Sequence, residues 1–69
     1  MKYKIGDYVK IMSCPIGSGA ETFIGYIGKI KYGSNNRTVP FYQIDDIDFV
    51  WEGIDLEKPT QEEIILTVL

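Results

Sequence analysis

The residues Ile24-Gly-Tyr-Ile-Gly-Lys-Ile-Lys-Tyr32 decide the fold of this chain. Two glycines, Gly25 and Gly28, stand three residues apart, and an alternation of side chains follows them. This alternation predicts that Gly28, Ile30 and Tyr32 share one face of a strand, while the two lysines between them share the other. Glycine at the entrance of such a segment is typical of a bend. We therefore predict a half-buried strand that bends where it begins.

Turn and strand signals on both sides of this segment predict the rest of an antiparallel sheet. Val9 and Ile11 alternate with polar or exposed residues, and we place both in the core. Tyr42 and Ile44 share one face of the next strand, which forms a hairpin with the central one through a turn at residues 33–38. The predicted strands cover residues 9–12, 24–32, 41–45, 49–51 and 64–68.

Residues 13–23 form a long first loop in this prediction. Pro15, Gly17 and Gly19 fall within five residues and exclude a regular element. Loops of this length in compact domains are commonly functional or mobile, so we expect this one to be the most mobile part of the chain. Near the other end, residues 54–57 indicate a turn or one turn of 3₁₀-helix that tucks Leu56 inward.

The last ten residues carry two conflicting signals. Thr60-Gln-Glu-Glu63 matches the capping box that begins a helix. The residues behind it, 64–69, are mostly β-branched and apolar, which favours a strand. A helix this short does not stand without packing. We therefore predict a closing strand at 64–68 paired with the first strand, with a helix as the alternative.

The chain is predicted to be one domain, residues 1–69, without a covalent or metal staple. Cys14 is its single cysteine and it has no histidine, which excludes an internal disulfide and a Cys/His zinc site. Packing of its nine aromatic residues, or self-association, must then stabilise a small core. No apolar run approaches the roughly 18 residues of a membrane helix, and residues 1–7 do not resemble a signal peptide. We expect a cytoplasmic protein with no membrane partner.

Charge divides the chain into a basic and an acidic part. Residues 1–40 carry a net charge of +4 and residues 41–69 a net charge of −7, which gives −3 in total. Proteins that bind nucleic acid are usually basic or carry a basic stripe. The first interpretation is that the two parts attract each other across the fold, and the second is a functional acidic face.

One set of residues resembles a known family. Gly6-Asp7-x-Val9-x-Ile11, followed after a loop by Gly25-x-x-Gly28-Lys29-Ile30, resembles the KOW-type signature of small SH3-like barrels. Residues 41–57 are similar to the later strands of short bacterial and phage barrels of that group. The resemblance implies an all-β, five-stranded SH3-like barrel with a long first loop. The fold by itself implies no activity.

A protein-binding surface is the functional hypothesis that the residues favour. Nine aromatic residues are more than a core of this size can bury, and exposed aromatic residues flanked by charges are typical of interface anchors. They could instead simply cap the open ends of a barrel. The candidate partner-binding residues are Tyr8, Tyr26, Phe41 and Trp51, with the carboxylates Asp45, Asp46 and Asp48.

Nucleic-acid binding is the second hypothesis. Lys10, Lys29 and Lys31 are predicted to line one face of the sheet, where Tyr8 or Tyr26 would offer a ring for base stacking. A solvated strand face is the simpler interpretation of the same residues.

Catalysis and metal binding are not expected. Without histidine the chain lacks the usual acid–base group at neutral pH, and no base stands ready to activate Cys14. The acidic run at 45–48 is interrupted by Ile47 and contains no glycine, unlike a calcium loop. We expect no catalytic residue, cofactor or metal.

The sequence thus predicts a non-enzymatic protein-binding module. Its small size and its likeness to phage barrels favour an interaction protein of phage or mobile-element type that acts on a host or defence protein. The acidic part would then occupy a basic, nucleic-acid-binding surface of that protein. A weak nucleic-acid accessory domain is the alternative, and formation of a homo-oligomer is a third prediction.

Overall fold

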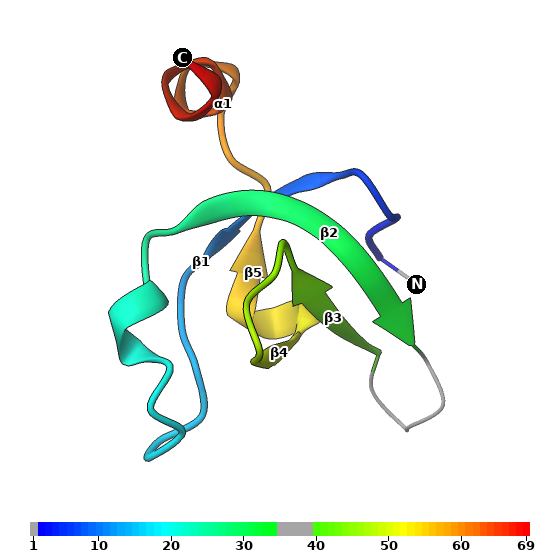
Figure 1. Ribbon diagram of the computed structural model, residues 1–69, viewed down its shortest axis with the longest axis vertical. Coiled ribbons are helices and arrows are strands. Elements are labelled where there is room, and N and C mark those ends of the chain that lie inside the picture. The colour runs from blue at the N-terminus through cyan, green and yellow to red at the C-terminus, as the bar shows by residue number, and fades with distance from the viewer. Residues whose placement is uncertain (1, 35–39) are drawn as a thin grey trace.

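A single antiparallel sheet of five strands holds the chain together, and a short helix follows it (Figure 1). The computed structural model describes residues 2–34 and 40–69, so most of the predicted turn at 33–38 lies outside the described residues. The elements are β1 (Tyr8–Ile11), η1 (Glu21–Phe23), β2 (Ile27–Ser34), β3 (Phe41–Ile44), β4 (Val50–Glu52), η2 (Gly53–Asp55), β5 (Leu56–Glu57) and α1 (Gln61–Val68), where η marks a 3₁₀-helix.

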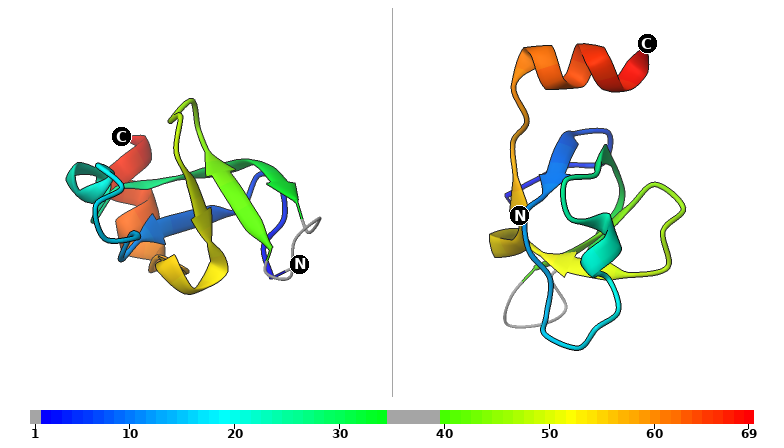
Figure 2. Two further views of the ribbon diagram at one scale, coloured as in Figure 1. Left: turned by 90° about the horizontal axis from the view of Figure 1, so that it is seen from below. Right: turned by 90° about the vertical axis from the view of Figure 1, so that its left-hand side faces the viewer.

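Strand β2 is the centre of the sheet, whose order is β4-β3-β2-β1-β5. Its first half pairs with β1, with Lys10 opposite Ile27, and its second half pairs with β3, with Ile30 opposite Ile44. Strand β2 bends strongly along its length, which lets it serve two neighbours that run in different directions (Figures 1 and 2). Strands β4 and β5 form the two edges, and no pairing between them closes the described sheet.

The predicted bend at the entrance of β2 is present. Gly25 has a φ of +94°, a conformation that favours glycine, and its N–H donates to the carbonyl of Ile11 at 2.7 Å. The predicted face of Tyr32 is wrong, because the register between β2 and β3 shifts between Ile30 and Tyr32. Such an irregularity reverses the alternation. Tyr32 is consequently 51% exposed while Ile30 is buried.

The core lies on the inner face of the sheet, as the alternation of side chains along the strands predicted. Val9, Ile11, Ile30 and Ile44 are buried, which confirms the prediction for each of them. Tyr42 is buried too, and its hydroxyl oxygen accepts hydrogen bonds from two N–H groups of the N-terminal segment. The remaining buried apolar residues are Tyr3, Ala20, Trp51 and Leu56.

Trp51 is not a surface residue, which corrects its place among the partner-binding candidates. It is the middle residue of β4, and strand alternation points it inward while Val50 and Glu52 on either side point outward. Only 1% of Trp51 is exposed, and its indole N–H finds no hydrogen-bond partner among the described residues. The strand also begins at Val50, one residue later than predicted.

The C-terminal segment is a helix, so the prediction of an all-β chain with a closing strand at 64–68 is wrong there. The edge of β1 is already occupied by β5, with Ile11 opposite Leu56. The capping box forms instead: the Glu63 N–H donates to the Thr60 hydroxyl oxygen at 3.1 Å, and the Thr60 N–H donates to the Glu63 carboxylate at 2.9 Å. These two bonds satisfy donors that a helix start leaves free.

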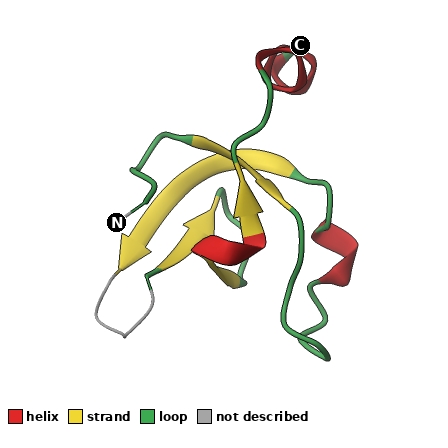
Figure 3. Cartoon of the chain, turned by 180° about the vertical axis from the view of Figure 1, so that it is seen from behind, coloured by secondary structure: helices red, strands yellow, loops and turns green. Residues whose placement is uncertain are grey.

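Helix α1 stands away from the sheet on the short segment that follows β5 (Figure 2, right; Figure 3). None of its eight residues is buried. Within the described parts of the chain, no helix has both the length and the apolar character needed to cross a membrane.

Gly28 is the position at which the sheet tolerates no side chain, and its replacement is our first prediction. A Cβ atom there would lie 2.5 Å from a carboxylate oxygen of Asp45, 2.7 Å from the ring of Tyr26 and 2.8 Å from a methyl group of Ile44. We expect Gly28→Ala to lower the free energy of unfolding by about 2 kcal/mol, since overpacking forces neighbours apart. Urea denaturation would measure this loss.

The matched control for this prediction is Gly53→Ala. A Cβ atom at Gly53 meets its nearest neighbour, the ring of Tyr42, at an ordinary 3.8 Å. We expect a change of less than about 0.5 kcal/mol there. Equal effects of the two substitutions would contradict the role assigned to Gly28.

Candidate functional site

Three partly exposed aromatic rings form a surface cluster over the end of the core, and we call Phe23, Tyr26 and Phe49 the aromatic rim. The Phe23 ring centroid lies 6.4 Å from that of Tyr26 and 5.8 Å from that of Phe49. Trp51 lies beneath, with its ring 6.2 Å from both Phe23 and Phe49. The rim therefore joins the end of the first loop to the turn between β3 and β4, residues 45–49.

Asp45 ties that turn to β2 at the edge of the rim. One of its carboxylate oxygens accepts a hydrogen bond from the Tyr26 hydroxyl, and the other accepts one from the Lys29 backbone N–H at 3.1 Å. Asp45 also has a φ of +48°, a left-handed conformation that aspartate tolerates better than most residues. The missing side chain of Gly28 leaves the room in which Asp45 and Tyr26 meet. Both side chains are thereby held in place.

The hydrogen bond to Asp45 raises the pKa of the Tyr26 hydroxyl above its ordinary value of 10.0, with burial and the negative charge as further causes. The phenol must give up its donated proton to ionise, which the carboxylate acceptor opposes. Tyr26 is 38% exposed, so its ring is available at the surface even though its hydroxyl is engaged.

The sequence named four of the residues that meet at this place and missed two. Tyr26 and Asp45 meet through a hydrogen bond, and Asp46 and Asp48 lie in the turn that carries Asp45. Phe23 and Phe49 were missed, because whether they face outward depends on how the first loop folds back. Two other candidates lie elsewhere: Phe41 is half-buried at the opposite end of β3, and Tyr8 lies on β1.

The three candidate nucleic-acid lysines are largely engaged by other groups. The Lys10 ammonium lies 2.6 Å from the Glu63 carboxylate, and that of Lys31 lies 2.5 Å from Asp46. The pKa of Asp46 is lowered by its hydrogen bond to Lys31, and the pKa of Lys31 is raised by the same bond. Among the described residues Lys29 pairs with no carboxylate, and its ammonium lies 5.3 Å from the centre of the Tyr8 ring.

A cleft of about 600 Å³ lies between the N-terminal segment, β1, β5 and α1. Its apolar walls are Tyr3, Tyr8, Leu56 and Ile64. Two lysines and two carboxylates also line it: Lys2, Asp7, Glu57 and Lys58. The sequence did not predict this cleft, and its wall residue Ile64 belongs to the tail for which a strand was predicted.

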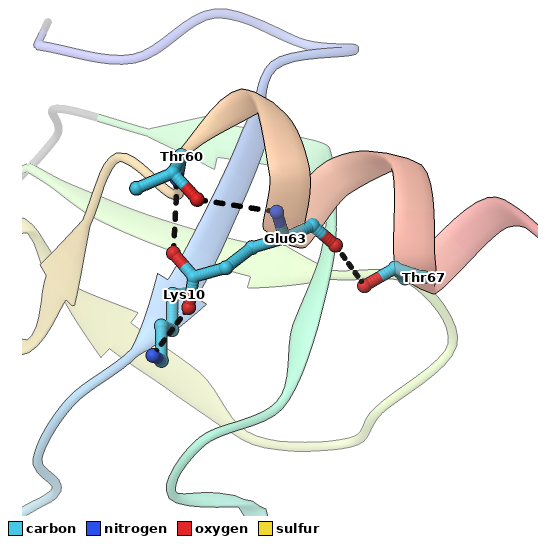
Figure 4. A network of polar contacts seen from close by, with 4 residues as sticks. All are labelled: Lys10, Thr60, Glu63 and Thr67. Atoms are coloured by element: carbon cyan, nitrogen blue, oxygen red, sulfur yellow. Dashed lines mark hydrogen bonds and ion pairs between the residues drawn. The ribbon is translucent and has the colours of Figure 1, made fainter.

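Glu63 connects α1 to the sheet with a single carboxylate (Figure 4). One of its oxygens accepts from the Thr60 backbone N–H, and the other from the Lys10 ammonium. The hydrogen bond to Lys10 and then that to Thr60 lower the pKa of Glu63 below its ordinary value of 4.5. The same side chain thus begins the helix and fixes it to β1.

Within the described residues no group of three or more histidine, cysteine or acidic side chains is placed to hold a metal ion. Cys14 is half-buried and packs against the core. Comparisons of the chain with family models, with curated proteins and with solved structures found no match.

The attachment of α1 is testable by a pair of substitutions in its first turn. We expect Glu63→Gln to reduce the helical circular dichroism signal and the amide protection of α1, because both its bonds weaken. Glu62→Gln is the matched control, since Glu62 is exposed in the same turn and outside the capping box. If both variants lost the same signal, the double role of Glu63 would be wrong.

The same attachment should depend on acid pH. Because the folded state lowers the pKa of Glu63, this carboxylate contributes stability above the unfolded value of 4.5. The contribution disappears as the pH falls through the lower folded value. We expect the amide protection of α1 to decrease between about pH 5 and about pH 2 in the natural chain, and to change less in Glu63→Gln.

The Tyr26 hydroxyl should ionise at a higher pH than an ordinary phenol. Because the folded state raises its pKa, its contribution to stability is complete below pH 10.0 and is lost as the pH rises through the folded value. Ultraviolet absorbance titration would detect this late phenol, and Asp45→Asn should move it to lower pH. Tyr26→Phe should remove the late step altogether, and its persistence in that variant would assign it to another residue.

Proposed function

We propose that this chain is a non-enzymatic protein-binding module whose contact surface is the aromatic rim. The observation that carries the proposal is that three rings stay partly exposed over Trp51 while a carboxylate-rich turn borders them. Aromatic anchors at the centre of a surface with charges around it are characteristic of binding hot spots.

The partner proposed for the rim is a protein segment that combines an apolar side chain with a basic one. The rings of Phe23 and Phe49 offer apolar contact area, and Asp48 is exposed beside them in the same turn. An arginine or lysine of the partner would meet this carboxylate and stack on a ring. The contacts of Asp45 fix Tyr26 in advance, so less conformational entropy is lost on binding.

The architecture proposed for the module is a small SH3-like barrel of the KOW type. What supports this is one five-stranded antiparallel sheet with a strongly bent central strand and a long connection between β1 and β2. With the resemblance to phage barrels, we propose a partner among host or defence proteins that bind nucleic acid. The basic surface of such a protein suits the acidic residues 41–69.

Nucleic-acid binding by the chain itself receives less support. Of the three lysines on which it depends, Lys10 and Lys31 are paired with carboxylates. Phosphate affinity depends on the number of free cations that replace counterions, so one unpaired lysine supplies little.

The proposal predicts that binding depends on ring and charge at the rim. In quantitative affinity capture with nuclease-treated lysate, we expect Tyr26→Ala to weaken the main captured protein about 30-fold, which corresponds to a hot-spot loss of about 2 kcal/mol. Asp48→Lys should weaken it as well, because the partner is basic. Glu62→Lys, an equal charge change on α1, should leave it unchanged.

Two results would contradict the proposal. One is capture that Tyr26→Ala and Asp48→Lys leave as strong as before. The other is a gel-shift with nucleic acid that falls steeply with salt and is abolished by Lys29→Glu with Lys31→Glu, which would favour the accessory-domain alternative.

A further inference from the structure

Helix α1 presents most of its apolar residues to solvent and turns Glu63 toward the protein. Glu63 extends from α1 toward Lys10 on β1 (Figure 4). Four apolar residues that follow are exposed to solvent: Ile65 to 47%, Leu66 to 67%, Val68 to 60% and Leu69 to 92%. In a self-contained domain the apolar stripe of a surface helix faces the core. This reversed orientation indicates that a further surface covers α1.

The polar contacts that hold α1 to the rest of the chain lie in its first turn. They comprise the capping box of Thr60 and Glu63 and the ion pair with Lys10. An eight-residue helix is marginal in water without packing, and the last turn of α1 lies beyond these contacts. The second half of the helix therefore depends on apolar cover that the described residues do not provide.

A cleft with both apolar and charged walls lies directly beside this apolar projection. The cleft between the N-terminal segment, β1, β5 and α1 has Tyr3, Tyr8 and Leu56 in its walls, and Ile64 of α1 forms another. Figure 2 shows α1 raised above the strands on this side of the molecule. The chain thus carries an apolar projection and a partly apolar cleft next to each other.

We propose that α1 and this cleft form a self-association interface, in which two copies related by a two-fold axis each place α1 over the cleft of the other. A two-fold interface uses the same surface on both copies, so each surface must contain both complementary parts. In this dimer Leu66 and Leu69 of each copy contact the cleft walls of the other copy. The same contact therefore forms twice.

The available area agrees with a dimer of modest affinity. With about 150 Å² for a fully exposed large aliphatic side chain, the four open residues of α1 expose on the order of 400 Å² per copy. Two copies give on the order of 800 Å², and the walls of the two clefts bring this to roughly the 1,000 Å² expected of a specific interface. A small core without a disulfide also makes association an effective source of stability.

Charge does not oppose this pairing. The segment 64–69 carries no charged side chain, and the cleft contains two lysines and two carboxylates that balance each other. The aromatic rim belongs to η1, the start of β2 and the β3–β4 turn, so the dimer is independent of the partner proposed for the rim.

The test is the mass of the full chain in solution. In sedimentation equilibrium from about 1 μM to about 1 mM, we expect the weight-average mass to rise from 7.9 kDa toward twice that value and then to stop. Leu66→Lys with Leu69→Lys should keep the chain monomeric to at least ten times the concentration at which the natural chain is half dimeric. These side chains are exposed in the monomer, so circular dichroism should show the sheet intact.

The matched control is Ile16→Lys with Ile54→Lys, which adds the same two charges at positions 104% and 82% exposed, in the first loop and in η2. This variant should dimerise like the natural chain. A monomer at every concentration would overturn the proposal, and so would a mass that continues to rise beyond two copies. A dimer that the helix variant preserves, or that both variants lose equally, would overturn it too.

Discussion

The close approach of the β3–β4 turn to β2 at Gly28 is the constraint on which the arrangement of the rim depends. Asp45, Tyr26 and Ile44 all occupy space that a single methyl group on Gly28 would fill. The approach brings the Asp45 carboxylate within reach of both the Tyr26 hydroxyl and the Lys29 N–H. The turn that carries Asp48 and Phe49 is thereby held beside the first loop. A glycine in the middle of a strand is usually a weakness, and here it is the condition for the surface cluster.

The pairing of the strands explains why the tail is a helix. Strand β2 divides its length between β1 and β3, and β5 occupies the outer edge of β1. Residues 64–68 cannot pair where β5 already lies beside Lys10 and Ile11, and the capping box at Thr60 favours a helix locally. The apolar residues that would have entered a sheet are displaced to a helix with no core beneath it. An exposed apolar face is therefore a consequence of sheet topology.

Local alternation predicted part of the core but not the surfaces. Val9 and Ile11, like Tyr42 and Ile44, were placed correctly because period-two patterning depends only on which face is buried. The pattern failed at Tyr32, where a register shift that no single residue announces reverses the faces. Trp51 was misplaced because its aromatic character was given more weight than its position between two outward residues. Tyr26 and Asp45 were named from the sequence. The contact between the Tyr26 and Phe23 rings was not predicted, because it depends on the path of the first loop.

Some of the opposite charges in the two parts of the chain pair with each other, and other carboxylates stay exposed at the surface. Both ion pairs observed among the described residues join the basic part to the acidic one, Lys10 with Glu63 and Lys31 with Asp46. They are exposed or half-exposed contacts, so each contributes little to stability by itself. They nevertheless pair two of the lysines that nucleic-acid binding would require with carboxylates of the same chain. The acidic part keeps exposed carboxylates such as Asp48 beside the rim. The internal pairing of charges therefore favours a basic protein over a phosphate backbone as the partner of this surface.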